Sequence, residues 1–193
     1  MARPREFEPE EALGAIMGVF WRNGFEGTSL QDIETATGLN KQSLYRIYAD
    51  KRAMYLAALR RYDETEIARS GETLSAPGTP RERFKRLFDD VLVETAEDGP
   101  RRGCFLCNAS IDEAQLDDDA RSFVHEAMRR VERKFREALG AGNAYARDAK
   151  LRNATAAKLL AFYFGLRVLI KANMPASVLK ASVRQALEEI RAG

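Results

Sequence analysis

Apolar residues recur along most of the chain with the three- and four-residue spacing of an α-helix. In the first such segment they follow the i, i+3, i+4, i+7, i+8 pattern that places apolar side chains on one helix face. These residues are Leu13, Ile16, Met17, Phe20 and Trp21. The strict alternation typical of a β-strand is not sustained at any point in the sequence. The pattern therefore predicts an all-α fold of about nine helices.

Glycine and capping residues divide the N-terminal part of the chain into short helices. The first helix is expected to end at Asn23-Gly24, a typical C-terminal stop signal. Thr28, followed by Gln31 three positions later, predicts a capping box at the start of a second helix. That helix is expected to end at the short turn "TGLN", positions 37–40.

A third helix is bracketed by Asn40 and Asp50, which are both favourable N-cap residues. Only about eight residues between them are therefore expected to be helical. On a helical wheel, Leu44 and Ile47 fall on one side and should anchor the helix. The opposite side carries Lys41, Gln42, Tyr45 and Arg46.

The second and third helices have the spacing of a helix-turn-helix, whose second helix enters the DNA major groove. Lysine can donate to guanine, glutamine can pair with adenine, and tyrosine and arginine can bind phosphate. The start of the second helix and Lys51 would add phosphate contacts. A basic helix face that only meets water is the alternative. The predicted contacts to double-stranded DNA are Thr28, Ser29, Lys41, Gln42, Tyr45, Arg46 and Lys51.

Positions 10–60 resemble the N-terminal domain of the TetR/AcrR family of bacterial transcriptional repressors, with "GFEGTSL" and "GLNKQSLYRIYADK" in the family's order. The resemblance implies a DNA-binding domain at 1–50 and an effector-binding and dimerisation domain at 51–193. Tyr48 stands where the family usually has phenylalanine, so we expect it to pack in the core. The phosphate contacts implied by the resemblance are Thr28, Ser29, Tyr45 and Lys51, and the base contacts are Lys41, Gln42 and Arg46.

The segment "KLLAFYFGLRVLI", positions 158–170, is apolar almost all round the helix. A surface helix needs only one apolar stripe, so a second copy of the chain would cover the other. With the last helix, at about 176–191, this segment resembles the pair that forms the family's four-helix dimer interface. Packing within a single chain is the alternative. The predicted interface residues are Leu160, Phe164, Val168, Leu179, Val183 and Leu187.

The family resemblance also implies a small-molecule effector that lowers the affinity of the dimer for a palindromic operator. Positions 84–164 are rich in phenylalanine, which suits an apolar effector pocket. An ordinary filled core would have the same composition. The sequence therefore leaves the effector and its site open.

The passage "RRGCFLCN" places Cys104 after two arginines and a glycine, at an expected helix start. The two arginines and the start of a helix each favour the thiolate form of cysteine. "GCFLCN" also resembles a motif in one branch of the TetR family, in which the cysteine matching Cys104 senses electrophiles and oxidants. Cys107 departs from that pattern and would supply a resolving thiol.

Two other interpretations of the cysteine pair remain open. Cysteine is often an inert, buried side chain, so Cys104 and Cys107 can simply be packed. A cysteine pair with two residues between also occurs in thiol oxidoreductases, but there it follows a strand, which this sequence does not predict. Two cysteines and a single histidine make a zinc site the less favoured choice.

The composition of the 193-residue chain is that of an ordinary soluble protein with a net charge of +2. A local basic stripe at positions 41–61 suggests phosphate contact at one place. No uninterrupted apolar run reaches the length of a membrane span, and the N-terminus lacks the apolar core of a secretory signal. We therefore expect a cytoplasmic regulator without a cofactor, and the sequence shows no catalytic set that would make it an enzyme.

Overall fold

The computed structural model describes residues 9–93, 95, 101–111, 118–141 and 143–191, and these residues form helices and no strand. The all-α prediction is confirmed. The α-helices are α1 (Pro9–Asn23), α2 (Leu30–Thr37), α3 (Lys41–Ile47), α4 (Lys51–Tyr62), α5 (Ala68–Ser75), α6 (Pro80–Val93), α7 (Phe105–Ile111), α8 (Asp118–Gly140), α9 (Asn143–Arg147), α10 (Ala149–Lys171) and α11 (Ala176–Glu188).

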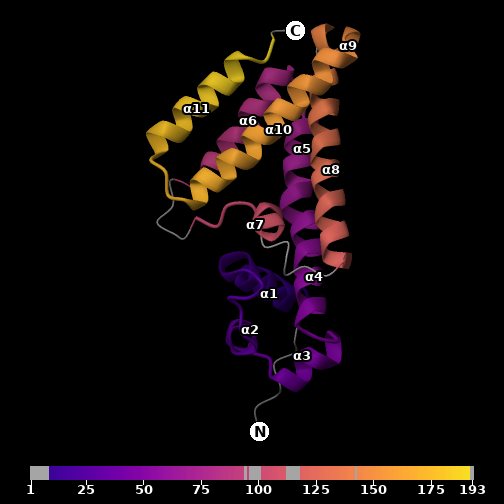
Figure 1. Ribbon diagram of the computed structural model, residues 1–193, viewed down its shortest axis with the longest axis vertical. Coiled ribbons are helices and arrows are strands. Elements are labelled where there is room, and N and C mark those ends of the chain that lie inside the picture. Colours follow the sequence, from indigo (N-terminus) through magenta and orange to yellow (C-terminus); the bar gives the residue numbers. More distant parts are fainter. Residues whose placement is uncertain (1–8, 94, 96–100, 112–117, 142, 192–193) are drawn as a thin grey trace.

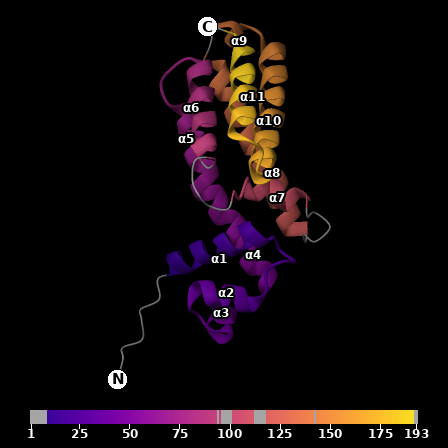
Figure 2. The same ribbon diagram turned by 90° about the vertical axis from the view of Figure 1, so that its left-hand side faces the viewer.

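The helices form two parts that lie one above the other (Figure 1, Figure 2). Helices α1, α2 and α3 make a small unit at one end, and α5, α6, α8, α10 and α11 make an elongated bundle at the other. A π-helical turn, Asp63–Ile67, joins α4 to α5, so that one long helix runs from the small unit into the bundle. Asp63 in this turn forms an ion pair with Arg130 of α8, with 2.7 Å between the charged atoms. The domain boundary at positions 50 and 51 stays a prediction, since α4 packs on both α1 and α8.

The predicted capping box at the start of α2 is wrong by one residue. Ser29 is the N-cap, and its hydroxyl accepts a 3.1 Å hydrogen bond from the Asp32 N–H. The Asp32 carboxylate accepts in return from the Ser29 N–H at 2.7 Å. Thr28 cannot cap the helix because its hydroxyl donates at 2.7 Å to the carbonyl of Gly24 and is buried in the turn after α1.

Two hydrophobic cores hold the molecule together. The first joins α1, α4 and α7 with residues of α2, α3 and α8. The second joins α5, α6, α8, α10 and α11. Phe84, Phe88 and Phe135 lie in the second core and are fully buried, so they fill it instead of lining an open pocket. The sequence left open whether these phenylalanines line an effector pocket or fill a core. For these three residues the structure shows a filled core.

Candidate DNA-binding surface and cysteine site

The two predicted capping residues lie on either side of α3: Asn40 caps its start, and Asp50 caps the start of α4, which follows it. The Asn40 side chain accepts from the Ser43 N–H at 2.8 Å, and the Asp50 side chain, which caps α4, accepts from the Ala53 N–H at 2.8 Å. Leu44 is completely buried and fastens α3 to the first core. The opposite face, which carries Lys41, Gln42, Tyr45 and Arg46, is exposed.

The second anchor of α3 is not the one predicted. Ile47 was expected to pack beside Leu44, but its side chain is 48% exposed. Tyr48, immediately after α3, is half-buried and packs against the first core instead. Ile47 is the last residue of α3, and the backbone becomes extended at Tyr48, whose ring packs against the core. The expectation that Tyr48 packs in the core agrees with this contact.

The residues proposed to flank α3 differ in what they can offer to DNA. Ser29 lies exposed at the start of α2, although its hydroxyl donates to the Asp32 carboxylate at 2.7 Å. Thr28 is 1% exposed, so its side chain is a structural part of the turn and not a phosphate ligand. The Lys51 ammonium lies 4.4 Å from the centre of the Phe25 ring, which positions it at the start of α4.

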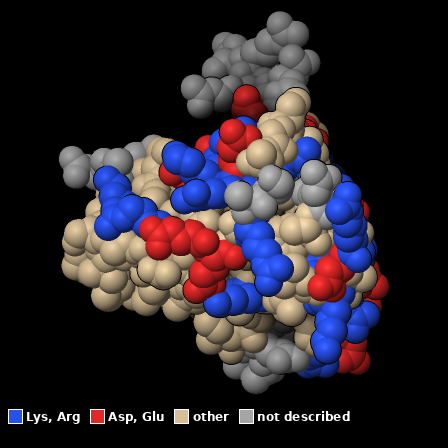
Figure 3. Space-filling view, turned by 90° about the horizontal axis from the view of Figure 1, so that it is seen from above, with Lys and Arg blue, Asp and Glu red and all other residues tan. Residues whose placement is uncertain are grey.

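The end of the molecule far from α3 has no single sign of charge. Seen from that end, Lys and Arg side chains are interleaved with Asp and Glu (Figure 3). A mixed surface of this kind produces no field that attracts a polyanion. The face of α3, which carries Lys41 and Arg46 and no acidic residue, is the better candidate for phosphate contact.

The two cysteines lie in a tight junction between α7 and α10. Both are free and buried, and Cys104 directly precedes the first residue of α7, as predicted. Gly103 has a φ of 68°, and a Cβ at this position would lie 2.9 Å from the carbonyl oxygen of Arg167. The Arg167 guanidinium donates at 2.5 Å to the Gly103 carbonyl. Glycine is therefore required for the backbone beside Cys104 to approach α10 so closely.

The surroundings of the two thiols drive their pKa values apart. Burial alone would raise the pKa of Cys104, but a hydrogen bond with Cys107, the charge of Arg167 and a hydrogen bond with Tyr62 together lower it to about 6. The hydrogen bond to Cys104, with burial, raises the pKa of Cys107. Cys104 is therefore mostly thiolate at neutral pH, while Cys107 remains a thiol that donates to it.

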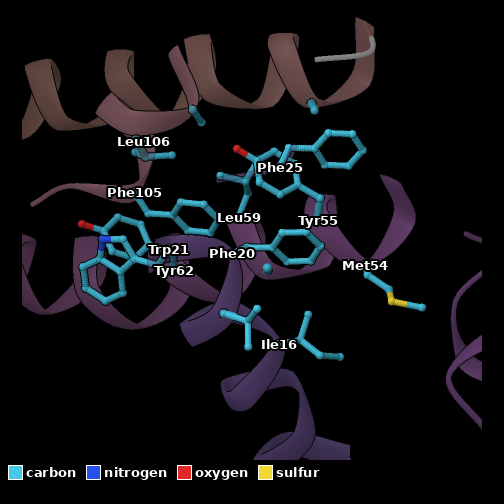
Figure 4. Close-up of a cluster of buried hydrophobic side chains, with 14 of the residues drawn as sticks. Ile16, Phe20, Trp21, Phe25, Met54, Tyr55, Leu59, Tyr62, Phe105 and Leu106 are labelled. Carbon is cyan, nitrogen blue, oxygen red and sulfur yellow. The ribbon is translucent and has the colours of Figure 1, made fainter. Parts of the chain in front are cut away.

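Cys104 and Cys107 belong to the same core as the DNA-binding helices, and Figure 4 shows Phe105 and Leu106, the two residues between them, beside side chains of α1 and α4. The Phe105 ring, next to Cys104, packs edge-on against Tyr55 and Tyr62 of α4 at centroid distances of 5.5 and 5.8 Å. Tyr55 in turn packs against Phe20 of α1 at 5.1 Å. Packed rings therefore connect the residue next to Cys104 with α1 and α4, a contact between distant segments that the sequence could not reveal.

The predicted dimer surface is only partly available to a second chain. Leu179, Val183 and Leu187 of α11 are at most 7% exposed and pack in the second core of their own chain, so their assignment to an interface is corrected. Val168 of α10 is 44% exposed, and Leu160 and Phe164 are half-buried. Helix α11 is amphipathic, and its larger apolar residues face the second core, where their burial stabilises the bundle.

A stripe of mostly small apolar residues remains uncovered on the outer faces of α10 and α11. By length and hydropathy α10 would also pass as a membrane-spanning helix, a test that core helices of soluble proteins pass as well. One of its faces is buried in the bundle. The exposed residues of the stripe are Ala154, Ala157, Ala161, Gly165, Val168 and Leu169 of α10 and Val178 and Ala181 of α11.

No group of three or more His, Cys, Asp or Glu side chains suited to a metal ion occurs in the described part of the chain. The acidic segment "DEAQLDDDA", positions 112–120, is expected to be solvated; its residues 112–117 lie outside the described residues, and Asp118 and Asp119 are in the first turn of α8. His125, the one histidine of the sequence, is exposed on α8.

Comparison with known proteins gives consistent matches over most of the chain. Residues 12–58 match the family model described as bacterial regulatory proteins, tetR family. The chain is 30% identical over 135 residues to the uncharacterized HTH-type transcriptional regulator YezE of Bacillus subtilis, covering 70% of either protein. It is 32% identical over 108 residues to the HTH-type transcriptional repressor ComR of Escherichia coli, covering 55% of this chain and 51% of ComR.

A solved structure of similar fold contains DNA. It is a cysteine mutant of the TetR family transcriptional regulator CifR complexed with 26 bp double-strand operator DNA. The two chains superpose with a TM-score of 0.83 at 28% sequence identity, over 98% of this chain and 100% of the CifR chain. The similarity thus extends through both parts of the molecule, beyond the residues that the family model matches.

Proposed function

The chain belongs to the TetR family of DNA-binding transcriptional regulators, and from this premise we propose that it is a homodimeric repressor released from its operator by modification of Cys104. The observation that carries the DNA-binding part is the exposed polar face of α3 above the buried Leu44. Lys41, Gln42 and Arg46 approach base edges in the major groove. Phosphate contacts come from Ser29, Tyr45 and Lys51.

The proposal is tested by selecting bound DNA from a random pool with the parent protein and with Gln42→Ala. Loss of a base contact should weaken binding about tenfold and change the preferred base at one position of each half-site. Lys150→Ala, at the exposed start of α10, removes a lysine far from α3 and should leave affinity and preference unchanged. Uniform weakening without a change of preferred base would remove Gln42 from the base-reading set.

Homodimer formation is supported by the uncovered small-residue stripe on α10 and α11. Alanine and glycine let helix backbones approach closely, so two copies of α10 can pack against each other and against α11. A two-fold axis would then place two α3 helices for two half-sites of a palindrome, about 34–36 Å apart or a multiple of that. The expected mass of the protein in solution is that of two chains, measurable by light scattering during size-exclusion chromatography.

Release through Cys104 is supported by its thiolate character and its position in the core shared with α1 and α4. The thiolate attacks an electrophile, or takes an oxygen atom from a peroxide and leaves hydroxide. Cys107 then displaces water from the resulting sulfenic acid to form a disulfide. Cys104 precedes the first residue of α7 instead of lying within the helix, and the hydrogen bond between the two thiols brings their sulfur atoms close together.

A thiol oxidoreductase is the weaker alternative for the cysteine pair. The relatives are named as transcriptional regulators, and Cys104 is 1% exposed, which denies access to a protein substrate. The two classes are separated by one measurement. A regulator loses operator affinity after treatment with mild oxidant and regains it with dithiothreitol, whereas an oxidoreductase would reduce a model disulfide catalytically and leave DNA binding unchanged.

A further inference from the structure

The sulfur of Cys104 is surrounded by groups from three helices. Cys104 is 1% exposed and directly precedes α7, whose Cys107 forms one hydrogen bond with it. Arg167 of α10 acts on the thiol through its positive charge, and Tyr62 of α4 forms a second hydrogen bond with it. Of these three partners, only Tyr62 belongs to the helix that runs from the small N-terminal unit into the bundle (Figure 1).

Tyr62 is the last residue of α4, and its ring is fixed by two neighbouring rings. It packs edge-on against Trp21 of α1 at a centroid distance of 4.8 Å and against Phe105 of α7 at 5.8 Å (Figure 4). The Tyr62 side chain is 1% exposed. Because side chains in a close-packed interior keep one rotamer, these contacts hold the Tyr62 hydroxyl at the Cys104 sulfur.

In the hydrogen bond between Tyr62 and Cys104, the tyrosine is the donor. Burial, together with the negative charge of Cys104, raises the pKa of Tyr62 well above its ordinary value. The phenol therefore keeps its proton at neutral pH, whereas a thiolate has no proton to donate. A hydrogen bond to a charged acceptor is stronger than one to a neutral acceptor, so this donor favours the thiolate over the thiol at Cys104.

A second buried tyrosine lies in the same region but has a different partner. Tyr163 of α10 is 3% exposed, and its hydroxyl forms a hydrogen bond with Ser70 of α5. The hydroxyl of Tyr163 is not among the groups that lower the pKa of Cys104, whereas the hydroxyl of Tyr62 is. The two tyrosines therefore differ in the one contact that matters for the thiol.

We propose that Tyr62 is a positioning residue of the cysteine site, whose hydroxyl donates to the Cys104 sulfur and holds it as a reactive thiolate. In a reaction with iodoacetamide, the sulfur forms a bond to carbon and displaces iodide, while Tyr62 keeps its proton. The product is an uncharged thioether, which is a weak acceptor. Modification of Cys104 therefore takes away the charged acceptor of a buried donor at the end of α4, which is costly for that donor.

The inference rests on the proposed release through Cys104, for which it names the residue of α4 that responds to the thiol. The test compares the alkylation of Cys104 by iodoacetamide across pH in the parent and in Tyr62→Phe, with the modified peptide identified by mass spectrometry. Phenylalanine keeps both ring contacts and removes only the hydroxyl.

Loss of one hydrogen bond to a charged acceptor should raise the midpoint of the pH–rate profile by about one pH unit. Below both midpoints, Tyr62→Phe should therefore react about tenfold more slowly than the parent, since its thiolate fraction is smaller by that factor. Above both midpoints the two rates should converge, because the thiolate is then fully formed in both proteins.

Tyr163→Phe is the matched control, because it removes a buried hydroxyl that bonds with Ser70 and not with Cys104. Its midpoint should stay within about 0.3 pH units of the parent value. The ultraviolet absorbance of the thiolate is followed in a pH titration of the same three proteins. This second measurement reports ionisation directly and does not depend on how easily the reagent reaches a buried sulfur.

Three outcomes would overturn the proposal: an unchanged midpoint in Tyr62→Phe, an equal shift in Tyr163→Phe, or a higher rate in Tyr62→Phe at every pH without a shift. The last result would show that the hydroxyl only fills space in the core. All of these measurements use the free protein. If the midpoint shifts but the alkylated parent still binds its operator, release through Cys104 fails and the role of Tyr62 stands. If the operator is released and the midpoint does not shift, only the role of Tyr62 fails.

Discussion

Replacement of Gly103 by alanine should destabilise the protein strongly, because two independent costs act at this position. The backbone φ of 68° lies in the left-handed region, which costs an alanine about 1–2 kcal/mol. The new Cβ would also lie 2.9 Å from the Arg167 carbonyl oxygen and 3.1 Å from the Lys171 Cβ. Backbone atoms of α10 cannot move aside as the end of a flexible side chain can.

The backbone at Gly103 must therefore withdraw from α10, and this weakens the hydrogen bond that Arg167 donates to the Gly103 carbonyl. A hydrogen bond from a charged donor contributes about 1.5–3 kcal/mol. Together with the φ penalty, and allowing for partial relaxation, Gly103→Ala should lower the free energy of unfolding by about 2–4 kcal/mol.

The change is measured by urea denaturation followed through Trp21 fluorescence, at one fixed protein concentration. Gly14→Ala is the matched control, since Gly14 lies inside α1 and a Cβ there meets no atom within 4 Å. That variant should be stabilised by up to about 1 kcal/mol. A loss below about 1 kcal/mol in Gly103→Ala, or an equal loss in both variants, would refute the steric reasoning.

Three further predictions concern α3, the stripe and the thiol. Leu44→Ala should lower the free energy of unfolding by about 2–5 kcal/mol and abolish operator binding, because a fully buried anchor of α3 is lost; retained affinity in a gel-shift assay would contradict this role. Val168→Lys should convert the dimer to a monomer in light scattering, since it places a charge within the uncovered stripe, whereas the exposed Lys150→Ala should not. The alkylation rate of Cys104 by iodoacetamide should rise with pH through a midpoint near 6 and level off above neutrality, because the thiolate is the reactive form. A rate that keeps rising towards pH 9 would show that the lowered pKa is wrong, and a rate that persists in Cys104→Ser would show that Cys107 is the thiol that reacts.

Much of the DNA-binding unit could be predicted from local sequence signals. Capping residues such as Asn40 and Asp50 act on atoms three residues away, so their effect is visible in the sequence itself. The exposed face of α3 follows from helical periodicity in the same way. The error at the start of α2 was also local. Thr28 and Ser29 each have a polar residue three positions later, so the spacing of a capping box fits both, and the structure shows that Ser29 is the cap.

The bundle was less predictable, because helical periodicity identifies an apolar face without showing what covers it. Leu179 and Val168 both belong to apolar stripes, yet one is buried in its own chain and the other faces outward. The difference depends on how α10 and α11 cross, which involves residues far apart in the sequence. The same limit applied to the phenylalanine-rich segment 84–164. Its composition agreed equally well with a filled core and with a pocket.

The sequence by itself determined the all-α class, most helix boundaries of the N-terminal unit and the resemblance of that unit to the TetR family. Each of these depends on residues within a few positions of one another. Only the tertiary structure brought Arg167 beside Cys104, and Arg102 onto Trp21. The residues are more than sixty positions apart in both pairs, so the charge that lowers the pKa of Cys104 and the stacking of Arg102 on Trp21 arise from packing, which no local pattern encodes.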